Sequence, residues 1–234
     1  DILLGSGDSR RTVGFAATAK FDEVQLSITN VLGVNLSETT VYQLVLRDLC
    51  PGGPFDCGET AILESKNHPV IINAERTGFD GLACVDCSID NVDGVISANT
   101  DEFATIKATV DLLSPARISV LNPTDTYPAG TTAGFIIDTN SNNLVELDLL
   151  QQLRINTYNN GELQETSTGS NLLTLTVLFI TIGSGDGVFH VGFETTKSYD
   201  EIQLEVGSLV DANVLSETID VYNAFVDFHT VNSN

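Results

Sequence analysis

The sequence predicts an all-β protein, built as an antiparallel β-sandwich or jelly roll. Most apolar segments alternate apolar and polar residues with a period of two, which is typical of half-buried strands. Turn signals recur between these segments, as they do in sandwiches of many short strands. No alternation of strands with helices indicates a parallel α/β sheet. Hydrophobic residues make up 42% of the 234 residues, which is enough to fill a core.

One motif occurs twice and sets the expected domain organisation. Residues 21–26 read Phe-Asp-Glu-Val-Gln-Leu and residues 199–204 read Tyr-Asp-Glu-Ile-Gln-Leu, an offset of 178 residues. A chain of 234 residues therefore holds one complete repeat and the end of the repeat before it. We expect residues 1–48 to be the C-terminal strands of a preceding repeat, residues 49–88 a junction bounded by cysteines, and residues 89–234 the sandwich body.

Strands are expected where β-branched and aromatic residues alternate with polar ones. In chain order they cover residues 24–28, 40–46, 103–110, 118–120, 132–137, 155–158, 163–166, 172–182, 188–195, 202–206 and 219–228. Between two of them, the pair Asn160–Gly161 supplies the positive φ values of a type I′ hairpin turn. Residues 143–153 favour a short helix because their leucines recur with roughly helical spacing, and a strand is the alternative.

Four cysteines flank the expected junction: Cys50, Cys57, Cys84 and Cys87. Their even number and the absence of methionine fit an oxidising, extracellular setting. A disulfide between Cys84 and Cys87 would close a tight loop of the kind found at redox sites. We therefore expect Cys50 and Cys57 to pair with Cys84 and Cys87. The alternative is a zinc site with four thiolate ligands.

The chain is strongly acidic, with 32 Asp and Glu residues against 10 Lys and Arg and a net charge of −22. Phosphate backbones bind clustered cations, so this charge argues against nucleic acid as a partner. It also disfavours anionic lipid headgroups. No apolar run approaches the ~20 residues that cross a bilayer, so we expect no membrane insertion. High-salt surroundings, bound Ca²⁺ or simple solubility would each account for the charge.

A calcium site is predicted on the acidic stretch that follows the last cysteine. Calcium prefers six to eight oxygen ligands from carboxylates, amides and carbonyls on a turning loop. The candidate ligands are Asp90, Asp93, Asn99, Asp101 and Glu102. The alternative is an acidic surface loop, because Asp and Asn favour turns without any metal.

No constellation of residues predicts an enzyme or an organic cofactor. The repeated pairs Asp22–Glu23 and Asp200–Glu201 are adjacent on a strand and would point to opposite faces, so they suit a structural role better than catalysis. The three histidines form no HExxH motif, and no GxSxG elbow or P-loop is present. We therefore predict no catalytic residues.

Several segments together resemble a known repeat. They read Ala-Arg-Ile-Ser-Val at 116–120, Thr-Tyr-Pro-Ala-Gly at 126–130 and Leu-Gln-Glu-Thr at 163–166, followed by the motif at 199–204. This pattern resembles a repeat domain of very large Bacteroidetes surface proteins. Upstream, the run 84–94 is similar to the opening of those repeats, and that opening also resembles galactose-binding-like, discoidin-type jelly rolls.

The resemblance implies an Ig-like or discoidin-like sandwich in a secreted, cell-surface adhesin or filament of the type IX secretion and gliding-motility kind. The leading prediction is a structural repeat that builds a stiff stalk or fibre from tandem or strand-exchanged β-domains, with copies of itself or neighbouring repeats as partners. The alternative is a carbohydrate-binding module of a secreted protein, which binds surface glycans in a groove with an exposed tyrosine such as Tyr127 or Tyr158. The resemblance implies no catalytic residue.

Overall fold

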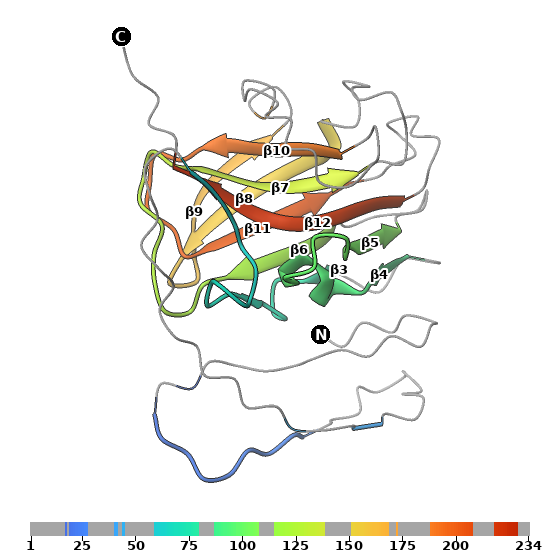
Figure 1. The fold of residues 1–234 in the computed structure, drawn as a ribbon, viewed down its shortest axis with the longest axis vertical. Helices are drawn as coiled ribbons and strands as arrows, with labels where there is room; N and C mark the ends of the chain where they lie inside the picture. Colours follow the sequence, from blue (N-terminus) through green and yellow to red (C-terminus); the bar gives the residue numbers. More distant parts are fainter. Residues whose placement is uncertain are drawn as a thin grey trace.

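Two antiparallel sheets of six strands each form a β-sandwich in the computed structural model (Figure 1). The structure describes residues 17, 19–27, 40–41, 44, 59–79, 87–107, 115–138, 151–168, 172, 188–207 and 218–228. The predicted all-β class and the antiparallel sandwich are confirmed. No helix in this described part of the chain is long and apolar enough to span a membrane.

The first sheet, sheet A, is organised around its longest strand. Its main path runs β10 (Val188–Glu194), β7 (Thr132–Asp138), β12 (Thr218–Asp227), β5 (Ala104–Lys107) and β4 (Ser88–Asp90). The short strand β1 (Thr60–Ile62) pairs with the C-terminal part of β12, on residues 225–227. A 3-10 helix, η1 (Val92–Ile96), follows β4.

The second sheet, sheet B, holds the second copy of the repeated motif. Its main path runs β2 (Ile71–Ile72), β6 (Ala116–Leu121), β11 (Glu201–Val206), β8 (Leu153–Asn159) and β9 (Glu162–Thr168). The strand β3 (Gly78–Phe79) also pairs with β6. The motif strand β11 is therefore enclosed, with β6 on one edge and β8 on the other.

The core lies between the two sheets and follows the predicted alternation. On β11, Ile202, Leu204 and Val206 face it and have no exposed surface. The opposing sheet contributes alternate residues of β7 and β12, such as Phe135 and Val221. Since successive side chains on a strand point to opposite faces, Glu201, Gln203 and Glu205 lie on the outer face of sheet B.

The hairpin β8–β9 has the predicted turn. Asn160 and Gly161 have φ values of 50° and 80°, both in the left-handed region that a type I′ turn requires. A bulge in the pairing between Thr157 and Tyr158 follows directly. The turn therefore fixes which residues of β8 and β9 lie opposite one another, as the Asn–Gly signal predicted.

Two sequence predictions differ from the structure in the residues that it describes. Residues 59–79 were assigned to the junction, but they supply β1, β2 and β3, so the sandwich extends well beyond the predicted start at residue 89. Within the expected helix, only Gln151 and Gln152 of the described residues are helical, and Leu153 already begins β8. Residues 143–150 and 173–182 lie outside the described residues.

The predicted strand at residues 24–28 is wrong for the part that the structure describes. Residues 24–27 belong to no strand and are exposed, and the segment lies apart from both sheets (Figure 1). The alternation is present, but none of the described strands pairs with it. Of the expected strand at 40–46, residues 40, 41 and 44 are likewise exposed and outside any strand.

Candidate binding face on sheet B

The outer face of sheet B carries a row of polar side chains on three neighbouring strands. On β11, Glu201 lies opposite Tyr158, Gln203 lies between Ser119 and Asn156, and Glu205 lies between Arg117 and Arg154. Residues directly opposite on neighbouring strands project from the same face, so these groups are in mutual reach. The period-two pattern of β6, β8 and β11 thus creates the polar face as it creates the core.

Glu201 anchors a loop to this face. Its Oε1 accepts hydrogen bonds from Ser119 Oγ at 2.5 Å and Asn73 Nδ2 at 2.8 Å, and its Oε2 pairs with Arg76 at 3.1 Å. Burial raises the pKa of Glu201, against the lowering effects of the Ser119 hydrogen bond and the Arg76 charge. These contacts hold residues 73–76, the turn after β2, against the sheet.

The neighbouring Asp200 fixes the hairpin turn instead. Its Oδ2 accepts the backbone N–H of Asn160 at 2.7 Å. Burial raises the pKa of Asp200 as well. The repeated Asp–Glu pair therefore makes two different structural contacts, one to the β8–β9 turn and one to the 73–76 loop, which supports the structural interpretation of this motif.

Tyr158 is held in place from several sides. Its hydroxyl donates to Gln203 Oε1 at 2.9 Å, and the same oxygen accepts Asn156 Nδ2 at 3.0 Å. The Arg76 guanidinium carbon lies 4.4 Å from the centroid of the Tyr158 ring, which is a cation–π contact. Gln203 Nε2 in turn donates to the backbone carbonyl of Arg76. The ring of Tyr158 is half-buried, and its orientation is fixed before any ligand arrives.

An apolar edge adjoins Tyr158 on the last strand of sheet B. Leu163 of β9 lies directly opposite Tyr158, and 56% of its surface is exposed. Further along β8, the side chain of Arg154 is 52% exposed while it pairs with Glu205 at 3.1 Å. We call Arg76, Arg154, Tyr158 and Leu163 the Tyr158 patch. It combines a half-buried aromatic ring, an exposed aliphatic side chain and two guanidinium groups.

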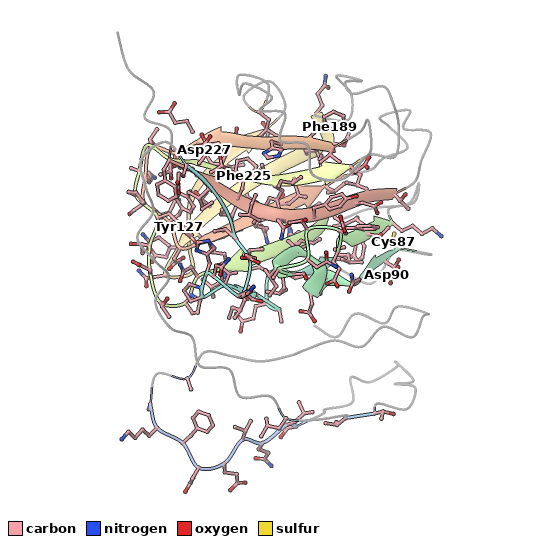
Figure 2. All side chains as sticks on the ribbon, viewed as in Figure 1. Cys87, Asp90, Tyr127, Phe189, Phe225 and Asp227 are labelled. Atoms are coloured by element: carbon pink, nitrogen blue, oxygen red, sulfur yellow. The ribbon has the colours of Figure 1, made fainter. Side chains whose placement is uncertain are left out.

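One of the two tyrosines named for a glycan groove is excluded. Tyr127 is only 1% exposed, and its ring packs on Tyr199 with centroids 5.2 Å apart. It bridges to the end of sheet B through paired backbone bonds with Tyr199, so it belongs to the core and the prediction of an exposed Tyr127 is wrong. Figure 2 places Tyr127 at the opposite end of the sandwich from Cys87 and Asp90. The other candidate, Tyr158, lies on the polar face.

Of the predicted calcium ligands, the structure places Asn99, Asp101 and Glu102 in one local turn, where Asn99 Nδ2 donates to Glu102 Oε1 at 3.4 Å. Among the described residues, no group of three or more His, Cys, Asp or Glu side chains is placed to hold a metal. Asp90 accepts a hydrogen bond from Ser88, and Asn99 caps the backbone N–H of Asp101 in a local turn. Those contacts are typical of an acidic surface loop, the alternative interpretation of Asp90, Asp93, Asn99, Asp101 and Glu102. Calcium binding itself stays a prediction.

The structure describes one of the four cysteines, Cys87. Cys87 immediately precedes β4, and its sulfur is disulfide-bonded. Cys50, Cys57 and Cys84 lie outside the described residues. The cross-pairing of these four cysteines therefore stays a prediction.

Sequence reasoning missed most of the polar face. Asn156 and Gln203 sit at period-two positions of expected strands, and the repeated Glu–x–Gln spacing could have marked Gln203. Arg154 directly precedes the expected strand at 155–158. Arg76 could not have been found in this way, because it comes from a turn and reaches Glu201 across 125 residues of chain.

No protein-family model and no curated protein matches this chain. Among solved structures, the chain is similar to the family 32 carbohydrate-binding module of NanJ from Clostridium perfringens in complex with galactose, with 14% identity, a TM-score of 0.40 and coverage of 72% of this chain and 98% of that one. It is also similar to a family 32 module from a family 31 glycoside hydrolase of Clostridium perfringens, with 10% identity, a TM-score of 0.36 and coverage of 65% and 88%. A third is a fucose-binding module of Streptococcus pneumoniae, with 12% identity, a TM-score of 0.32 and coverage of 61% and 87%.

Proposed function

We propose that this chain is a carbohydrate-binding module that holds a neutral glycan on the Tyr158 patch. The observation that carries the proposal is the fixed pairing of Tyr158 and Leu163, an aromatic and an aliphatic side chain, with the Arg76 guanidinium held against the Tyr158 ring and the exposed Arg154 four residues away on β8. A sugar ring presents apolar C–H groups and hydroxyl groups side by side. A patch that offers apolar surface with a few oriented polar groups complements both.

Pre-organisation strengthens this match. Tyr158, Asn156 and Gln203 are already joined by hydrogen bonds, and Thr166 Oγ1 extends the network to β9 by donating to Asn156 Oδ1 at 2.8 Å. Side chains that are ordered before binding lose less entropy when a ligand settles on them. The network therefore favours binding without adding a direct contact.

Electrostatics restrict the class of glycan. The chain as a whole carries a net charge of −22, which repels anionic ligands at a distance. On the face itself, Arg76 pairs with Glu201, and both Arg117 and Arg154 pair with Glu205. The expectation of neutral oligosaccharides, rather than sulfated or uronic ones, therefore rests on the net charge of the whole chain.

Isothermal titration calorimetry tests the proposal. The ligands are galactose, N-acetylgalactosamine, fucose and mannohexaose, the sugars named for similar structures. We expect Leu163→Asp and Tyr158→Ala each to weaken binding about tenfold or more. Leu163 is exposed, so its substitution leaves folding intact. The matched control is Tyr222→Ala, which removes a half-buried tyrosine on sheet A whose ring is tilted against that of Phe103, with centroids 5.1 Å apart.

Two results would contradict this function. One is the absence of binding to these sugars and to a broad array of neutral glycans. The other is full affinity in both Leu163→Asp and Tyr158→Ala, because a ligand would then be bound elsewhere on the molecule.

A second function is favoured by a separate observation, the exposed first copy of the repeated motif. We propose that the module is also a structural repeat of an extracellular adhesin, in which tandem sandwiches present glycan sites away from a cell. The disulfide at Cys87 supports an oxidising location. Small-angle X-ray scattering on a chain with two complete repeats tests this. We expect a rod with one dominant end-to-end distance, and a broad distribution of distances would count against a stiff stalk.

A further inference from the structure

We propose that residues 21–26 are a donor strand that fills the β11 position in a second copy of this β-sandwich, between its β6 and β8 strands, when the β11 strand of that copy is displaced. The proposal concerns β11, whose Glu201 and Gln203 contact Arg76 and Tyr158 of the Tyr158 patch, but glycan binding is not among its premises. It rests on the sequence of the segment, on its exposure, and on the contacts that the equivalent residues make in β11.

The two segments correspond residue by residue. The pairs are Phe21 with Tyr199, Asp22 with Asp200, Glu23 with Glu201, Val24 with Ile202, Gln25 with Gln203 and Leu26 with Leu204. Four of the six are identical, and the other two keep the aromatic or β-branched character of the side chain. A segment with this sequence meets the steric and polar requirements of the β11 position.

The apolar residues of the first copy lack the environment that the second copy has. Tyr199, Ile202 and Leu204 are completely buried. Their counterparts Phe21, Val24 and Leu26 are 50%, 37% and 60% exposed. Exposed apolar surface is unfavourable at roughly 25 cal/mol per Å². The same segment belongs to no strand, and unpaired extended segments are templates for pairing with another chain.

The polar residues identify which partner fits. In β11, the Glu201 carboxylate accepts hydrogen bonds from Ser119 and Asn73 and forms an ion pair with Arg76. An exposed segment has no need for a glutamate and a glutamine spaced by one residue, whereas the slot between β6 and β8 requires both. Glu23 and Gln25 supply those groups at the same spacing. The partner that these groups fit is therefore a sheet with β6-type and β8-type strands, and a second copy of this sandwich provides such a sheet.

Two sequence differences explain why residues 199–204, rather than residues 21–26, form β11 between β6 and β8 in this chain. Phe21 lacks the hydroxyl that Tyr199 places 3.0 Å from Thr131 Oγ1. Ser27 stands where Glu205 pairs with Arg117 and Arg154. The first copy is a weaker fit than β11 itself, so it occupies the position only where the local β11 is absent. Exchange of an equivalent strand between copies is a low-cost route to association.

The test removes β11 from its position between β6 and β8 in the full chain. The double substitution Ile202→Asp and Leu204→Asp disables β11 and leaves residues 21–26 as its replacement. We expect this chain to unfold cooperatively in urea and to have twice the mass of one chain or more by light scattering. Adding Val24→Asp and Leu26→Asp should abolish cooperative unfolding. The control is Val24→Asp with Leu26→Asp in an otherwise unchanged chain, which should unfold as the wild type does.

Each outcome decides a part of the proposal. If the β11-disabled chain is as unfolded as the quadruple variant, residues 21–26 are not a donor strand. If the β11-disabled chain folds as a monomer, a second molecule of this chain is not the partner of residues 21–26. A synthetic peptide of residues 19–27 provides a second measurement, since it should restore cooperative unfolding to the quadruple variant. The same peptide with Val24→Asp and Leu26→Asp should not, and equal effects of the two peptides would overturn the proposal.

Discussion

Two segments of this molecule share a sequence and differ in structure. Residues 199–204 enter β11 at the centre of sheet B, where they are buried and bonded on both edges. Residues 21–26 carry the same pattern of apolar and polar side chains, yet they are exposed and belong to no strand. Local propensity is the same for both, so neighbouring strands make the difference. Alternation indicates which side chains can be buried, and the presence of β6 and β8 decides whether they are.

Removing the same leucine from each copy should give the largest contrast. Leu204→Ala empties part of the core and should lower the free energy of unfolding by about 2–5 kcal/mol. Leu26→Ala removes a side chain that is 60% exposed and should change it by less than about 0.5 kcal/mol. Urea unfolding monitored by circular dichroism measures both. Equal costs for the two substitutions would mean that the first copy is packed as the second is.

The repeated glutamate gives the next contrast. Glu201→Ala leaves the Ser119 hydroxyl, the Asn73 amide and the Arg76 guanidinium without their shared acceptor, which should cost about 2–3 kcal/mol. Arg76 is partly exposed, and water then solvates it and limits the loss. Glu23→Ala should have no measurable effect on unfolding. A large effect of Glu23→Ala would show that this carboxylate also has buried partners.

A hydroxyl that distinguishes the two copies should have a smaller effect. Tyr199→Phe gives β11 the aromatic residue that the first copy already has and removes the contact with Thr131 at 3.0 Å. We expect a loss of about 1 kcal/mol, because Thr131 still donates to the Pro128 carbonyl. The reverse change, Phe21→Tyr, should leave stability unaltered. No loss in Tyr199→Phe would mean that the hydroxyl contact does not contribute to the fit of β11.

Acidification should have the smallest effect on the free energy of unfolding, and it acts through Glu201 of the second copy. Burial raises the folded-state pKa of Glu201 above its ordinary value of 4.5. A carboxyl with a raised pKa binds its proton more tightly when folded, so the stability it contributes is present below the unfolded pKa and is lost as the pH rises through the folded pKa. The stability of the wild type relative to Glu201→Gln should therefore increase as the pH falls from 7 toward 4.5. An opposite trend in urea unfolding would mean that the Arg76 charge outweighs burial.

The sequence predicted those parts of the fold that depend on local patterns. Strands at β5, β6, β7, β8, β9, β10, β11 and β12 follow from alternation and from β-branched and aromatic residues, and the Asn160–Gly161 turn follows from its requirement for positive φ. The strands β1, β2, β3 and β4 were missed because each has only two or three residues, too few to show a period. The proline-rich and glycine-rich stretch before them also favoured a junction.

The binding face could be predicted only in part. Tyr158 was named as a candidate, while Tyr127 was named for the same reason and proved to be core. Composition does not distinguish an aromatic side chain that closes the end of a sandwich from one on its outer face. The contact of Arg76 with Tyr158 and Glu201 depends on how the turn after β2 folds back over sheet B, which no local pattern encodes.

The most direct test of this account compares amide hydrogen exchange in the two copies of the motif within the intact chain. The amides of residues 202–206 should exchange only when the whole sandwich unfolds, because β6 and β8 bond β11 on both edges. The amides of residues 21–26 should exchange at the rate of unprotected peptide. Equal protection of the two segments would contradict the claim that neighbouring strands, rather than the sequence of the motif, decide its structure.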